Sequence, residues 1–149
     1  MATPTYTLID SVTLGSSAPV TITGISQDFS DLIVVHTGGY QQFRFNNNST
    51  ASTYLMVEMV GNGSSATSAT TSSSRFISNN MTGTDGATVI QIMDYTATDK
   101  HKSVLVRANS GSATAAHAGR WANTSAINEI NFNSSLPAGA TIHIYGIEA

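Results

Sequence analysis

Along most of the chain, apolar residues alternate with polar ones in short runs that end at Gly, Asn, Ser or Pro. A period of two is typical of β-strands with one buried face, whereas a helix has a period near 3.6. About ten short antiparallel strands in one domain predict an all-β chain that forms either two packed sheets or a barrel. The pattern predicts these strands at residues 5–14, 18–23, 31–38, 42–46, 53–60, 87–95, 102–108, 116–122, 127–133 and 140–148.

Three of the runs need separate interpretation. Residues 32–35, Leu-Ile-Val-Val, are apolar at every position, so we expect a central strand that is covered on both faces or whose outer face is buried by another subunit. Residues 54–60 and the Ala-rich residues 113–118 also fit a short helix. Nearby glycines and the short length of both segments favour strands.

The 149 residues predict a single domain. Residues 61–74, which continue from Gly-Asn-Gly into a Ser/Thr tract, contain no large apolar side chain, so we expect a long exposed loop that a neighbouring chain could order. Residues 1–4 are expected to form a short extended arm, because Pro4 favours an extended predecessor. The chain has neither a secretory leader nor an apolar run of ~20 residues, so we expect a protein made in the cytoplasm without membrane contact.

Composition narrows the function classes. Only 10% of the residues are charged, the net charge is −3, and there is no cysteine. The few basic residues are scattered, so nucleic-acid binding is not expected. A disulfide framework and a thiolate metal site are excluded. Ser, Thr and Asn keep such a chain soluble, which is typical of a structural particle component, whereas acid, base and nucleophile chemistry needs clustered titratable groups.

Two loop motifs resemble ligand sites and are better explained as turns. Gly61-x-Gly63-x-x-Ala66 matches a dinucleotide fingerprint, but a Ser/Thr tract follows it where the fingerprint requires a helix. Residues 82–86, together with Asp94 and Asp99, offer too few oxygens for a calcium site, and Asp-Gly is a strong hairpin signal. We therefore expect no cofactor and no metal from these motifs.

Candidate catalytic residues are equally sparse. His36, His101, His117 and His143 share no metal-ligand spacing. The chain contains no Gly-x-Ser-x-Gly elbow, and its acidic residues are isolated. We therefore expect a protein that is not an enzyme. Trp121, the only tryptophan, could form a sugar-stacking platform with Arg120, although a core or interface anchor is the favoured interpretation.

Five segments together resemble, in order, small structural proteins of tailed phages, which are common in phages of cyanobacteria and other aquatic bacteria. They are Tyr6 to Leu14, Phe29 to Val35, Gly61 to Ser65, Trp121 to Ile130 and Ile142 to Ile147. The resemblance spans most of the chain and consists of turns and alternation, so no functional residue transfers. It implies an all-β, two-sheet, jelly-roll-like sandwich. It also implies a capsid decoration (cement) protein on the outer surface of the virion, bound to the major capsid protein and to copies of itself, with a homotrimer expected.

Proteins that look similar also occur on tails and fibres. The alternative is therefore a tail-fibre or receptor-binding module that binds carbohydrate through Trp121, Tyr40 and the loop Asn46 to Asn48. A fibre-borne glycan hydrolase is a third interpretation, and it requires two carboxylates in one cleft. The low charge suits a cement protein, because uncharged interfaces lose little solvation free energy when they are buried.

Overall fold

The computed structural model describes residues 5–39, 41–78 and 86–148, and every regular element within them is a β-strand. No helix that could span a membrane is found in these ranges. The strands are β1 (Tyr6–Thr13), β2 (Ala18–Thr23), β3 (Asp31–Thr37), β4 (Gln41–Phe45), β5 (Tyr54–Gly61), β6 (Ala66–Ser73), β7 (Phe76–Ser78), β8 (Ala87–Met93), β9 (Lys102–Asn109), β10 (Thr114–Trp121), β11 (Glu129–Leu136) and β12 (Thr141–Ile147).

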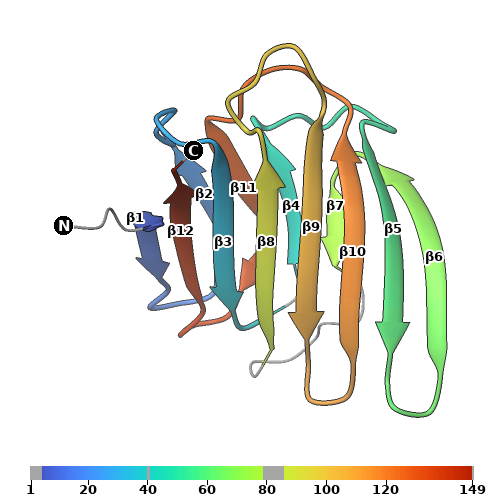
Figure 1. Cartoon of the computed structure of the whole chain (residues 1–149). Coiled ribbons are helices and arrows are strands. Elements are labelled where there is room, and N and C mark those ends of the chain that lie inside the picture. The colour runs from blue at the N-terminus through green and yellow to red at the C-terminus, as the bar shows by residue number, and fades with distance from the viewer. Residues whose placement is uncertain (1–4, 40, 79–85, 149) are drawn as a thin grey trace.

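The strands form two antiparallel sheets of unequal size. The larger sheet has eight strands in the order β1-β12-β3-β8-β9-β10-β5-β6, and the smaller has four in the order β2-β11-β4-β7. Figure 1 shows the larger sheet in front, with the smaller sheet behind it. The predicted all-β sandwich of antiparallel strands is therefore confirmed.

The core fills the space between the two sheets and is rich in aromatic rings. Phe45 of the small sheet meets Trp121 of the large sheet edge to face, with ring centroids 5.4 Å apart. Phe76 meets Tyr54 in the same way at 5.0 Å. A β-carbon on Gly119 would lie 2.5 Å from the Phe76 ring, so this glycine is what lets β7 approach β10. Edge-to-face pairs of this kind add to the stability that burial alone provides.

Strand β3 lies inside the large sheet, between β12 and β8, as its apolar sequence predicts. Leu32 and Val34 are fully buried towards the small sheet, and the alternate residues Ile33 and Val35 are half-buried on the other side. No strand in the described ranges covers that second side (Figure 1). The large sheet thus has an inner face packed on the core and an outer face open to solvent.

The predicted loop at residues 61–74 is wrong. Only residues 62–65 form a turn, and β6 then pairs with β5 along its whole length, as the edge strand of the large sheet. The tract is exposed as expected, but main-chain hydrogen bonds to β5 hold it, and β-branched Thr fits a strand without any apolar face. Strand β7 was not predicted either, because its three residues are too few to show a period. The two segments that also fitted a helix are strands β5 and β10, and the arm at 1–4 lies outside the described residues.

Candidate docking surface

The outer face of the large sheet presents apolar side chains on most of its strands, interspersed with polar and charged ones. Strand registers align its outward residues into rows that cross all eight strands. One row is Leu8, Tyr145, Ile33, Gln91, Leu105, Ala118, Val57 and Thr70. The next is Ser11, His143, Val35, Val89, Arg107, Ala116, Met59 and Ser68. Side chains within a row are direct cross-strand neighbours.

The most exposed part of this face lies on β9, β10 and β5, and we call these residues the outer patch: Leu55, Val57, Met59, Leu105, Ala116 and Ala118. Val57, Met59 and Leu105 keep 46%, 62% and 44% of their surface in contact with solvent. Ala116 and Ala118 lie between them on β10, and their short side chains project only a little from the sheet. Contiguous exposed apolar surface is uncommon on monomeric soluble proteins, and it often marks a binding site.

The charges around the outer patch are all positive. On the outward positions of β9, β10, β5 and β6, the ionisable side chains are Arg107 and Arg120, and both are exposed. Neither forms an ion pair with a carboxylate in the described part of the chain. The outer patch therefore suits an apolar partner surface that carries carboxylates at matching positions.

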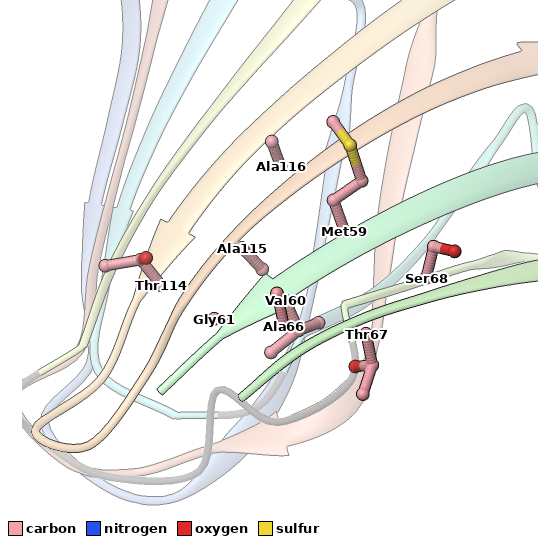
Figure 2. Close-up of a pocket in the computed structure, with 9 residues that line it drawn as sticks. All are labelled: Met59, Val60, Gly61, Ala66, Thr67, Ser68, Thr114, Ala115 and Ala116. Atoms are coloured by element: carbon pink, nitrogen blue, oxygen red, sulfur yellow. The ribbon is translucent and has the colours of Figure 1, made fainter. Parts of the chain in front are cut away.

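An open hollow of about 510 Å³ lies at the free end of β5, β6 and β10. Figure 2 shows the residues that line it, and none of them is ionisable: Met59, Val60, Gly61, Ala66, Thr67, Ser68, Thr114, Ala115 and Ala116. Its hydroxyl groups and alkyl side chains can contact another surface but cannot supply an acid, a base or a metal ligand. The hollow thus borders the outer patch, with which it shares Met59 and Ala116, and its lining offers no ionisable group.

The residues proposed for carbohydrate binding have structural roles. Trp121 is fully buried among Phe45 and Tyr54, so it is a core anchor, as favoured above, and cannot stack on a sugar. Asn46 has a positive φ of 50° and holds three main-chain groups: its Nδ2 donates to the Ala126 carbonyl, and its Oδ1 accepts from the N–H groups of Asn128 and Glu129.

The rest of the Asn-rich loop is used in the same way. The main-chain N–H of Asn47 donates to the side chain of Asn131, and Asn48 Oδ1 accepts from the N–H of Thr50. This loop is therefore a turn stabilised by its own amides. Tyr40 lies outside the described residues, while Arg120 is exposed on the outer face, away from the buried indole.

Two titratable side chains face each other inside the sheet. His117 on β10 and Glu58 on β5 are register partners, with Nδ1 and Oε2 3.6 Å apart and both side chains buried. Burial lowers the pKa of His117, and the Glu58 carboxylate partly offsets that effect. Within the described residues neither atom has a hydrogen-bond partner, so the contact is a buried pair between two neighbouring strands.

Of the remaining histidines, two lie on the large sheet and one lies in the loop before β9. His36 is buried on β3 and stacks on Phe132, and burial lowers the pKa of His36 to about 4. His101 is exposed, and His143 Nδ1 lies 2.9 Å from the Ser11 hydroxyl on the open outer face. No group of three or more metal-binding side chains is found in the described ranges. These residues do not come together as a site there.

Buried Lys102 also has a structural role. Its ammonium group donates to three main-chain carbonyls, those of Ala97 at 2.5 Å, Lys100 at 3.1 Å and Thr124 at 3.3 Å. Burial lowers the pKa of Lys102, and the carboxylates of Asp99 and Asp94 raise it. The lysine thus ties the β8–β9 loop to the segment after β10.

The two loop motifs are turns where they are described. Asn62 Oδ1 accepts from the N–H groups of Ser64 and Ser65, and Gly63 has a φ of 83°, so the glycine motif is the tight β5–β6 turn followed by a strand. This confirms the turn interpretation. Asp94 lies in the turn after β8 and pairs with Lys100 at 3.6 Å. Of residues 82–86, only Gly86 is described.

Comparisons with known proteins add no assignment. A scan against protein-family models and a search of curated proteins both find no match. The likeness to phage structural proteins therefore rests on the five sequence segments alone. The outer patch itself was not singled out from the sequence, although the run Tyr-Leu-Met-Val-Glu-Met-Val at 54–60 carries apolar side chains on both faces and contains the signal.

Proposed function

We propose that this protein is a non-enzymatic component of a tailed-phage virion, which decorates the outer surface of the capsid and binds the major capsid protein through the outer patch. The observation that supports this most directly is the exposed apolar row over β9, β10 and β5, which no strand in the described ranges covers. The resemblance of the five segments supplies the biological setting. Both point to adhesion as the activity.

Covering the outer patch with a partner surface is favourable in free energy. Burying Val57, Met59 and Leu105 removes apolar surface from water, at roughly 25 cal/mol for each Å². The charged side chains beside the outer patch are Arg107 and Arg120. Contact therefore removes water from few ionic groups, and the cost in solvation free energy is small. Arg107 and Arg120 then orient the protein on a capsid surface that carries carboxylates. Affinity that comes mainly from apolar contact changes little with salt.

The carbohydrate-binding alternative has no comparable support. Trp121 is buried, and the side-chain amides of Asn46 and Asn48 are engaged with the main chain. A tail location, in contrast, would use the same outer patch on a different partner. The experiment must therefore separate capsid from tail as well as binding from no binding.

The test uses capsids of the encoding phage prepared without this protein. We expect the wild-type chain to co-sediment with them to saturation, and Leu105→Glu to lose at least tenfold in affinity because it places a charge inside the buried contact. The matched control is Ser135→Glu, which adds the same charge at an exposed position of β11 in the other sheet. Cryo-EM of intact virions completes the test.

Density for the protein on the tail alone would overturn the capsid assignment. Equal loss of binding in both variants would show that charge, and not the outer patch, decides the contact. Either result can be interpreted, because both substituted side chains are exposed and lie outside the core.

A further inference from the structure

The two sheets have four edges, and three of them are protected against pairing with another chain. A β-bulge between Leu8 and Asp10 interrupts β1. Strand β2 contains Pro19, which has no N–H to donate, and β7 is only three residues long. Bulges, prolines, charges and short length are the usual means by which edge strands avoid unwanted pairing.

The fourth edge, β6, has none of these protections. Its register with β5 runs without a break from Gly61 opposite Ala66 to Tyr54 opposite Ser73. The sequence Ala-Thr-Ser-Ala-Thr-Thr-Ser-Ser contains no charge and no proline over eight residues. In Figure 1 this strand closes the large sheet on the side away from β1, and no strand of the described ranges lies beyond it. Its side chains are mostly exposed on both faces.

The turn shows which main-chain groups of β6 point away from β5. The N–H of Asn62 donates to the carbonyl of Ser65 at 3.2 Å, so these two residues form a hydrogen-bonded pair. Antiparallel pairs alternate between hydrogen-bonded and non-hydrogen-bonded, so the next bonded pairs along the ladder contain Thr67, Ala69, Thr71 and Ser73. The N–H and C=O groups that point away from β5 therefore belong to Ala66, Ser68, Thr70 and Ser72.

We propose that β6 pairs antiparallel with β6 of a second copy of this chain, about a two-fold axis at Ala69, so that two large sheets join into one. In this register Ala66 bonds Ser72 of the second copy and Ser68 bonds its Thr70, and the same pairs recur across the axis. Every outward main-chain group of the strand is then used. Ala69 faces its own copy in the close non-hydrogen-bonded position, where a small side chain fits best.

A second copy is the partner that this edge fits. A strand without charges can meet itself without like-charge repulsion, and Thr67 faces Thr71 of the second copy, a favourable cross-strand pair. The row that contains Leu105, Ala118 and Val57 ends at Thr70, so pairing joins the outer patches of the two copies into one surface. This contact makes dimers, and a trimer would need a different contact.

Pairing through β6 does not depend on capsid binding, because it takes place in the free protein. Sedimentation equilibrium and light scattering of the full chain are expected to show a concentration-dependent dimer. Thr70→Pro removes one outward N–H and adds a ring at the edge, where proline is tolerated by the strand itself. We expect this variant to be a monomer at concentrations where the wild type is a dimer, with unchanged far-ultraviolet circular dichroism.

Cysteine cross-linking tests the register, since the natural chain contains no cysteine. In Ala69→Cys the two thiols face each other with Cα atoms about 4.5 Å apart, within disulfide range, so diamide oxidation should yield a covalent dimer. Ala66→Cys is the matched control, because its partner is Ser72, and it should cross-link far more slowly. A wild type that stays monomeric, a dimer that Thr70→Pro leaves intact, or equal cross-linking of both variants would each overturn the proposal.

Discussion

The two faces of the large sheet use similar residues for different purposes. On β5 the inward side chains Tyr54 and Met56 are almost fully buried, whereas the outward Leu55, Val57 and Met59 keep between 37% and 62% of their surface exposed. The strand is apolar on both sides, and the four-stranded sheet covers only one of them. Alternation therefore tells which residues share a face, and the second sheet decides which of the two apolar faces becomes the core.

The comparison predicts the largest loss of stability for an inward aromatic residue. Trp121→Ala removes a fully buried indole that packs against Phe45 and Tyr54, so we expect the free energy of unfolding to fall by about 3–5 kcal/mol. Urea denaturation followed by circular dichroism measures this. A loss below about 1 kcal/mol would be close to the effect of a surface substitution, and it would show that the inner face is not the main source of stability.

A second prediction concerns the pH dependence of the inner face. Burial lowers the pKa of His36 from 6.5 to about 4. Between those values the unfolded chain binds a proton that the native chain does not, so stability falls as the pH decreases from 6.5 to 4, and this contribution is constant above 6.5. The expected loss at the lower limit is about 3 kcal/mol.

The matched variant for this prediction is His36→Gln, which cannot take up the proton. Its stability should change less with pH than that of the wild type in the same acidic window, and the difference between the two curves isolates the histidine from the carboxylates. Parallel curves would contradict the assignment. Burial also lowers the pKa of His117, so some dependence of the same sign should persist in the variant.

A smaller effect is expected where the inner face has no space. A β-carbon on Gly146 would overlap the ring of Phe29, which covers the end of β12. Gly146→Ala should therefore cost about 1–3 kcal/mol of stability. The same substitution in a Phe29→Ala background should cost less, because the ring is gone, and a double-mutant cycle measures this coupling. Additive losses would place the strain elsewhere.

Much of the fold could be predicted from the alternation alone. All ten predicted strands are present, because period-two runs bounded by Gly, Asn and Pro report directly on half-buried strands. Strand β6 was missed for a physical reason. Its Ser and Thr side chains bury little, and its pairing depends on main-chain bonds to β5, which leave no apolar pattern in the sequence.

The outer patch was harder to predict than the strands. Leu105 and Val57 belong to segments far apart in the sequence, and they become neighbours only through the registers of β9, β10 and β5. Trp121, in contrast, was singled out as the only tryptophan in the sequence, and it lies in the core. A sequence pattern identifies apolar residues, but strand order determines which of them gather on an open face.

The smallest change in stability is expected on the outer face, and it sharpens the comparison most. The double variant Val57→Ser/Met59→Ser replaces two exposed side chains with the polar residue that β6 already uses, so the free energy of unfolding should stay within about 0.5 kcal/mol of the wild type for each substitution. The same protein should bind capsids at least tenfold more weakly. Because neither side chain packs in the core between the sheets, stability and binding should separate in this variant, whereas they cannot separate in Trp121→Ala. A loss of stability as large as that of an inward residue would mean that the outer face is part of the core, and the docking proposal would then fail.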